Sequence, residues 1–134
     1  MEKKVLMSFD IDGTLEVGDP PGPITLDMVR KAQAAGIICG SSSDRSMTAQ
    51  QNLWDRAGIT PAFTSLKHML SDIKEQFEAD YYYHTGDRDL DKQFALEAGF
   101  SYMWYWEAES EPWLNLANGE EPNPEWGTAP APQY

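Results

Sequence analysis

Short apolar runs alternate along this chain with segments whose apolar residues recur at helical spacing. The runs are typical of buried strands, and we expect strands at residues 5–9, 37–39, 61–64, 81–84 and 100–106. The spacing between them predicts helices at 25–35, 46–57, 66–77 and 90–98. Because strand and helix alternate, the pattern predicts a three-layer α/β fold with a central parallel sheet of four to five strands.

Polar clusters directly follow three of the expected strands, at residues 10–14, 40–45 and 85–91. The carboxyl ends of parallel strands meet at one edge of a sheet, and ligands bind there in folds of this type. Asp10 and Asp12 come immediately after an apolar strand, where a carboxylate is costly to bury unless a cation or several donors meet it. We therefore expect a polar site at this edge.

The length of 134 residues is typical of one domain with a single core, which we place at residues 1–106. The C-terminal tail, residues 107–134, is rich in proline and acids and has no Lys or Arg, so we expect no regular element there. It also contains two tryptophans and two leucines. Part of the tail is therefore expected to lie against the domain or a partner, with its end at 129–134 mobile.

The net charge is −12, which argues against an extended nucleic-acid surface or binding to an anionic membrane. A local positive pocket for one phosphate remains compatible with this charge. Cys39 is the single cysteine, so no internal disulfide can form and a reducing, cytoplasmic setting is expected. Residues 1–9 are too short for a signal peptide or a membrane helix.

The string Asp-Ile-Asp-Gly-Thr-Leu at residues 10–15 resembles the first motif of the haloacid dehalogenase (HAD) superfamily of phosphotransferases. Residues 86–91 resemble its last motif, and the likeness covers residues 4–106. The resemblance implies a HAD-like, Rossmann-like fold and a Mg²⁺-dependent phosphomonoester hydrolase that acts through an aspartyl-phosphate. The loop at 16–23 is too short for a cap domain, so a small capless member is expected. Its open site suits a large phosphorylated substrate, or closure by a homo-oligomer.

The resemblance also implies roles for single residues. Asp10 would be the nucleophile, and Asp12 the general acid and base. Mg²⁺ would be held by the Asp10 carboxylate, the Asp12 backbone carbonyl and Asp87, with Asp91 binding directly or through water. Lys67 would bind the phosphate and offset its charge and that of the nucleophile.

Phosphate contacts are expected from two further places. Gly13 and Thr14 allow a sharp turn and offer backbone N–H groups and a hydroxyl to an anion. In the second motif of the HAD superfamily, a serine or threonine after the second strand donates a hydrogen bond to the phosphoryl oxygen. Counting back from the end of the next helix favours Ser41, then Ser42, with Ser43 left open.

Two other functions stay open. One is a phosphoryl-accepting receiver-like domain, although its acceptor Asp would follow the third strand and residues 60–65 contain none. The other is a non-catalytic metal-binding or interaction module. Arg45 could reach a substrate or be a solvated residue at a helix start, and His84 is expected as a strand residue near the site.

Overall fold

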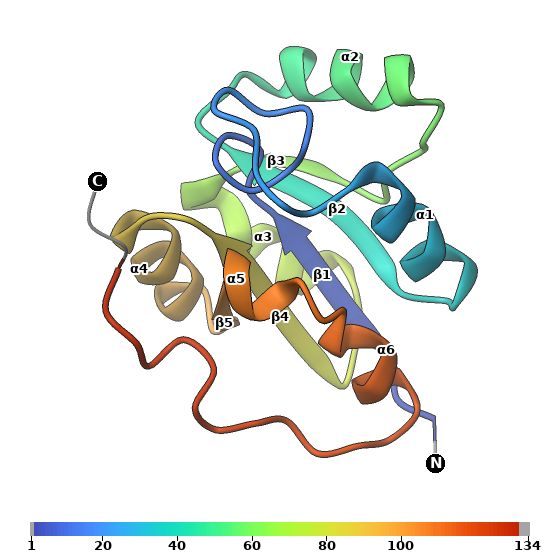
Figure 1. Ribbon diagram of the computed structural model, residues 1–134, viewed down its shortest axis with the longest axis vertical. Coiled ribbons are helices and arrows are strands. Elements are labelled where there is room, and N and C mark those ends of the chain that lie inside the picture. Colours follow the sequence, from blue (N-terminus) through green and yellow to red (C-terminus); the bar gives the residue numbers. More distant parts are fainter. Residues whose placement is uncertain (1, 132–134) are drawn as a thin grey trace.

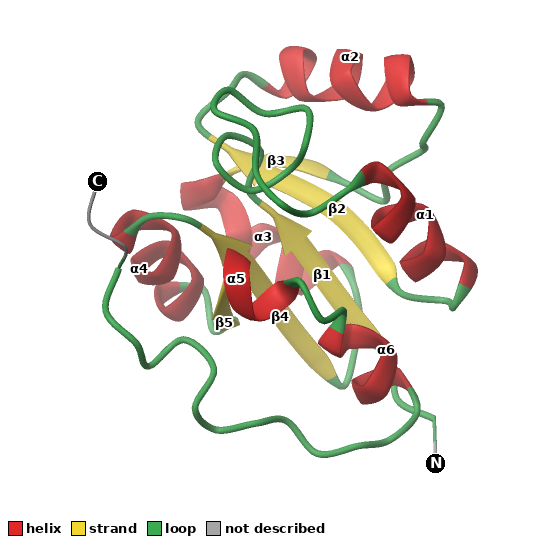
Figure 2. Cartoon of the chain, in the orientation of Figure 1, coloured by secondary structure: helices red, strands yellow, loops and turns green. Residues whose placement is uncertain are grey.

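The computed structural model describes residues 2–131 and contains one sheet with helices on both faces (Figure 1, Figure 2). The strands are β1 (Val5–Phe9), β2 (Ile38–Ser43), β3 (Thr64–Leu66), β4 (Tyr81–Gly86) and β5 (Ser101–Trp104). The helices are α1 (Leu26–Ala34), α2 (Met47–Ala57), the 3₁₀ turn η1 (Lys67–Met69), α3 (Leu70–Gln76), α4 (Asp89–Glu97), α5 (Tyr105–Ala108) and α6 (Pro112–Ala117). Among residues 2–131, no helix combines the length and the apolar content that crossing a bilayer requires.

The strands are parallel throughout and lie in the order β3-β2-β1-β4-β5. In the central strand β1, Phe9 is level with Ser41 of β2 and Thr85 of β4. The loop at residues 10–25 stands at the carboxyl end of the sheet (Figure 2). This architecture confirms the predicted α/β fold with its central parallel sheet.

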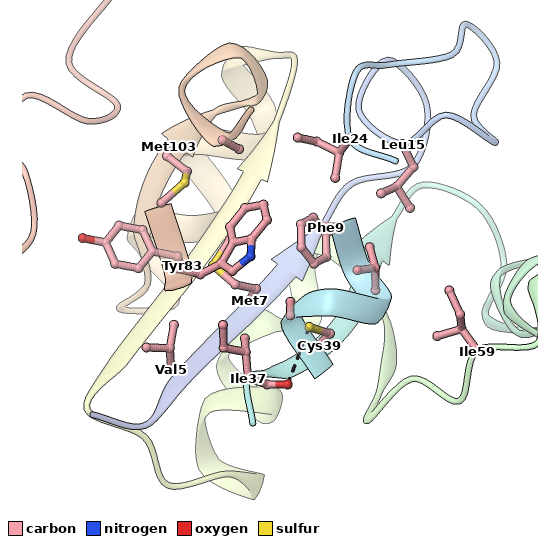
Figure 3. Close-up of a cluster of buried hydrophobic side chains, with 14 of the residues drawn as sticks. Val5, Met7, Phe9, Leu15, Ile24, Ile37, Cys39, Ile59, Tyr83 and Met103 are labelled. Carbon is pink, nitrogen blue, oxygen red and sulfur yellow. Dashed lines mark hydrogen bonds between the residues drawn. The ribbon is translucent and has the colours of Figure 1, made fainter. Parts of the chain in front are cut away.

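Alternate residues of β1 supply two hydrophobic cores. Val5, Met7 and Phe9 face the layer of α1 and α6, and Leu6 faces the layer of α3 and α4. Figure 3 shows the first core, in which the ring of Phe9 meets that of Trp113 edge-on at a centroid distance of 5.5 Å. A strand buried on both faces explains the unbroken apolar run, and the two cores confirm the three layers.

Side-chain caps fix the first two helices as predicted. Thr25 and Ser46 accept hydrogen bonds from the backbone N–H groups of Met28 and Ala49, each at 3.1 Å. Gly58 ends α2 in the left-handed conformation, with φ of 69°. The predicted starts of α1 and α2 are therefore confirmed.

The bounds of β2, β3 and β4 lie later in the chain than predicted. β2 continues through Ser43 and β4 through Gly86, beyond the predicted ends at 39 and 84, and β3 begins at Thr64 rather than at 61. These added residues are small or polar, so hydrophobicity does not reveal them. They are held in the sheet by pairing with a neighbouring strand on one or both sides, which a single segment of sequence cannot show.

The expectation that the tail contains no regular element is wrong, because α6 forms within it. The side chains of Trp113 and Leu116 are buried in the first core, which confirms that part of the tail lies against the domain. Propensity missed this helix because its stability comes from tertiary packing. The expected mobile end falls partly outside the described residues; inside them, the Ala129 carbonyl accepts a hydrogen bond from Trp104 Nε1 at 2.8 Å.

Candidate active site

Asp10 lies at the centre of the carboxyl edge, directly after β1. Its backbone N–H donates to the Thr85 carbonyl at 3.0 Å, so pairing with β4 continues one residue past the strand. The side chain is 3% exposed, and its Oδ1 lies 3.5 Å from Nζ of Lys67. The central strand thus delivers a carboxylate into a nearly water-free position next to one cation.

Three carboxylates converge at this point, as the sequence predicted for a metal site. Ligand atoms of Asp10, Asp87 and Asp91 all lie within 4.8 Å of one another, and all three residues are buried. Burial, and then the charge of Asp91, raises the pKa of Asp10 to about 9. Full ionisation of three buried carboxylates that lie close together is unfavourable unless a cation binds them. The donors are all oxygens, which fits a hard divalent ion such as Mg²⁺.

Lys67 is the buried cation of the cluster. It is 5% exposed, and its Nζ lies 3.0 Å from Oδ1 of Asp91. Burial alone would lower the pKa of Lys67, but the charges of Asp10 and Asp91 outweigh burial and raise it. The lysine therefore stays charged. It begins η1, and Asp44 also approaches it at 3.6 Å from the rim.

A buried chain of polar side chains lies beneath Asp91. Nε2 of His84 is 2.9 Å from Oδ1 of Asp91, and Nδ1 of His84 is 2.9 Å from Oγ of Ser8. Ser8 in turn donates to Ser42 Oγ at 2.8 Å. His84 is thus confirmed as a strand residue near the site, held in one orientation. Ser8 was missed, although it is paired in register with His84 and is the polar residue of an otherwise apolar run.

Asp12 differs from Asp10 in lying at the rim. Arg45 binds its carboxylate with two hydrogen bonds, from Nε at 3.2 Å and from Nη2 at 2.7 Å. The backbone N–H of Asp19 adds a third at 2.7 Å. The hydrogen bond from Arg45 is the main reason why the pKa of Asp12 is lowered. Arg45 is therefore bound to a candidate site residue, whereas the sequence left open whether it reached a substrate or was a solvated residue at a helix start.

The three candidate serines of β2 lie in different surroundings. Ser41 donates to Gln50 Oε1 at 2.7 Å and accepts from Trp54 Nε1 at 2.9 Å, which commits it to α2. Ser42 is bound to Ser8 in the core. Ser43 lines the cleft instead. The expected positions of Ser41 and Ser42 at the phosphate are therefore not supported, because β2 ends later than predicted.

The turn after Asp12 is also used differently from the expectation. The N–H of Gly13 donates to the Pro20 carbonyl at 2.6 Å and that of Thr14 to the Ile11 carbonyl at 3.1 Å, so both amides are already satisfied. The Thr14 hydroxyl is buried and finds no partner among the described residues. Gly13 has φ of 75°, and a Cβ there would overlap the Asp87 carboxylate. Its role is thus to let Asp87 approach, since only glycine fits.

These residues surround a small open cleft of about 250 Å³. It is lined by Asp10, Asp12, Asp19, Pro20, Ser43, Asp44, Lys67, Asp87 and Arg88. A larger hollow of about 610 Å³ lies around Lys4, Gly36 and Ala117, at the other end of the sheet. We assign the site to the smaller cleft because the converging carboxylates and Lys67 are there.

Comparisons with known proteins add little to this geometry. No family model matches the chain, and no curated protein matches it either. Among solved structures, the chain is similar to the core domain of a "putative phosphoglycolate phosphatase" from Streptococcus pneumoniae, determined by NMR. The two are 24% identical with a TM-score of 0.48, over 78% of this chain and 81% of that one. The function is therefore inferred from the residues of the cleft and their geometry.

Proposed function

We propose that this protein is a HAD-like, Mg²⁺-dependent phosphomonoester hydrolase in which Asp10 accepts the phosphoryl group. The observation that carries the proposal is the meeting of Asp10, Asp87 and Asp91 around Lys67, from distant parts of the sequence. Phosphoryl transfer needs a nucleophile and positive charge around the phosphoryl oxygens. This cleft offers both.

The metal is assigned mainly to Asp10, Asp87 and the backbone carbonyl of Asp12. Asp91 is the weaker direct ligand, because its Oδ1 already meets His84 and Lys67, at 2.9 and 3.0 Å. Its Oδ2 accepts the backbone N–H of Arg88 at 3.2 Å. We therefore assign Asp91 to contact through water. When bound, the ion supplies positive charge to the phosphoryl oxygens and keeps Asp10 ionised.

The reaction has two steps on the residues of this chain. A carboxylate oxygen of Asp10 attacks phosphorus and the bond from phosphorus to the ester oxygen breaks. Asp12, after taking up a proton from solvent, gives that proton to the departing oxygen. Asp12 then takes a proton from water, which attacks phosphorus and releases phosphate and Asp10. Asp12 is at the rim, where the ester oxygen leaves, and Lys67 stays charged beside Asp10.

The size of the cleft limits how much of a substrate it can hold. It can hold a phosphoryl group and an ion, so most of the substrate must lie outside it, whether open to solvent or covered by a second copy of the chain.

A receiver-like domain fits less well, since β3 is followed by Lys67 and not by an acid. A non-catalytic metal-binding module would keep the carboxylates but show no turnover.

The proposal is tested by hydrolysis of p-nitrophenyl phosphate with and without Mg²⁺. We expect Mg²⁺-dependent turnover that Asp10→Asn lowers by about a thousandfold or more, as for other lost nucleophiles. The matched control is Asp55→Asn, an exposed acid on α2 whose side chain accepts a hydrogen bond from Gln51 Nε2, and this variant should keep the rate. Turnover that survives Asp10→Asn would refute the nucleophile, and the absence of turnover from the wild type would favour the metal-binding module.

A further inference from the structure

The rim of the cleft carries a feature that the proposed reaction does not use. The cleft volume of about 250 Å³ is below the range of about 300 to 1,000 Å³ that is usual for small-molecule sites. The alcohol part of a phosphomonoester therefore lies at the rim once its phosphoryl group is next to Asp10. Whatever side chains stand there meet the leaving group first.

Arg45 is bound to Asp12, one of the residues that line this cleft. Its side chain is 30% exposed, and its Nε and Nη2 hold the Asp12 carboxylate. Asp12 must come within hydrogen-bond distance of the ester oxygen to protonate it, so the guanidinium lies close to the leaving group. A guanidinium has more N–H donors than this pair uses, since the bonds to Asp12 come from Nε and Nη2. The bond to Asp12 also holds these spare donors in a fixed direction.

The other charges of the rim favour a cation contact there. Asp19 and Asp44 line the cleft and repel a negatively charged leaving group, while the charge of Lys67 is taken up by Asp10 and Asp91. Arg88 is an exposed cation that lines the cleft. It follows β4, whereas Arg45 follows β2, so the two flank Asp10 in the sheet order.

We propose that Arg45 binds a second negative charge on the leaving group, so that the preferred substrates are phosphomonoesters carrying a carboxylate or another phosphate close to the ester. This inference rests on the proposed function. It assigns Arg45, rather than the less restrained Arg88, because planar guanidinium groups held in place bind carboxylate and phosphate with the greatest selectivity. Aryl phosphates whose leaving group carries no charged substituent would be turned over less efficiently.

The test compares three esters of similar size: phenyl phosphate, 3-carboxyphenyl phosphate and 3-carbamoylphenyl phosphate. We expect the wild type to prefer the carboxylate over the amide about tenfold in kcat/KM, as a charge-assisted contact allows. Arg45→Gln should bring this ratio close to one, and Arg45→Lys should restore part of it. The control is Arg56→Gln, an exposed arginine of α2, which should keep the ratio. Comparing ratios between variants cancels the intrinsic reactivity of each ester.

Failure of the inference can be told from failure of the proposed function. No turnover of any ester with Mg²⁺ refutes the function, whereas turnover with a wild-type ratio near one overturns the role of Arg45. A ratio that survives Arg45→Gln and is lost in Arg88→Gln also overturns it. Calorimetric titration with 3-carboxyphenylphosphonate and its carbamoyl analogue gives the same comparison without turnover. A preference for the carboxylate that Arg45→Gln removes supports the inference, and equal affinities contradict it. Thermal melts show whether each variant folds.

Discussion

Asp10 and Asp12 lie two positions apart in one loop, yet they belong to two different ionic regions. The inner region, Asp10, Asp91, Lys67 and His84, is almost fully buried, and Nζ of Lys67 lies 3.5 Å from Asp10 and 3.0 Å from Asp91. The outer region is the Asp12–Arg45 pair, in which both side chains are about one third exposed. Inner charges are strongly coupled because little water screens them, while outer charges are weakly coupled. The inner region thus suits a fixed nucleophile and metal site, and the outer one suits proton transfer and substrate contact.

The largest expected effect comes from breaking the inner region at Lys67. Lys67→Met removes the contact to Asp10 and leaves the buried Asp91 carboxylate without its cation, so we expect the free energy of unfolding in metal-free solution to fall by about 3 kcal/mol. Urea unfolding measures this. The control is Lys31→Met, which removes a surface pair with Glu111 and should cost less than about 1 kcal/mol. Equal losses of stability in the two variants would mean that burial does not decide how much an ion pair contributes.

A smaller effect is expected at Gly13, which has no side chain and so leaves room for the Asp87 carboxylate. Gly13→Ala combines a positive φ with overlap of the Asp87 carboxylate, so it should cost about 2 kcal/mol of stability and weaken Mg²⁺ binding about tenfold. Gly36 has φ of 87° with no atom near its absent Cβ. Gly36→Ala therefore shows the backbone cost alone, about 1 kcal/mol, and should leave Mg²⁺ affinity unchanged. Calorimetric titration with Mg²⁺ separates the two, and equal affinities would count against Asp87 as a ligand.

The inner region should also make stability depend on pH. The folded protein keeps a proton on Asp10, with a pKa of about 9, that the unfolded chain releases near 3.8. Without metal, Asp10 therefore contributes stability below about pH 4 that is lost as the pH rises towards about 9. Mg²⁺ replaces this proton, so its effect on Tm should grow by a few degrees between about pH 6 and pH 8.5. In Asp10→Asn the growth should disappear; a Mg²⁺ effect that is independent of pH in the wild type would contradict the shifted pKa.

The smallest change in stability is expected in the outer region. Arg45→Gln removes a pair whose side chains are about one third exposed, and it should lower the free energy of unfolding by less than about 1 kcal/mol. Urea unfolding next to Lys67→Met gives the comparison directly. A loss as large as that of Lys67→Met would show that the rim pair supports the fold, and the division into an inner and an outer region would then be wrong.

The sequence predicted the elements whose hydrophobic pattern is local, and it missed what depends on distant contacts. The run before Asp10 and the caps Thr25 and Ser46 could be read directly. The ends of β2 and β4 could not, since polar residues such as Ser43 join the sheet only through their neighbours. Helix α6 forms because Trp113 has a core to enter.

The candidate site shows the same division. The motifs identified Asp10, Asp87 and Asp91 as candidate metal ligands. They lie close together because parallel strands end at one edge of the sheet. The choice among Ser41, Ser42 and Ser43 could not be made from the sequence, because it depended on where β2 ends. The Asp12–Arg45 pair was left open because it joins two loops, and no local pattern fixes the direction of a loop side chain.

The central claim, that Asp10 takes the phosphoryl group, is tested most directly by trapping the phosphorylated protein. The protein would be mixed with Mg²⁺ and an aryl phosphate, quenched in acid within one turnover and digested for mass spectrometry. We predict the added mass of one phosphoryl group on the peptide that contains Asp10, and its loss in Asp10→Asn. Turnover without any phosphorylated Asp10 peptide, or the same group found on another residue, would contradict the account.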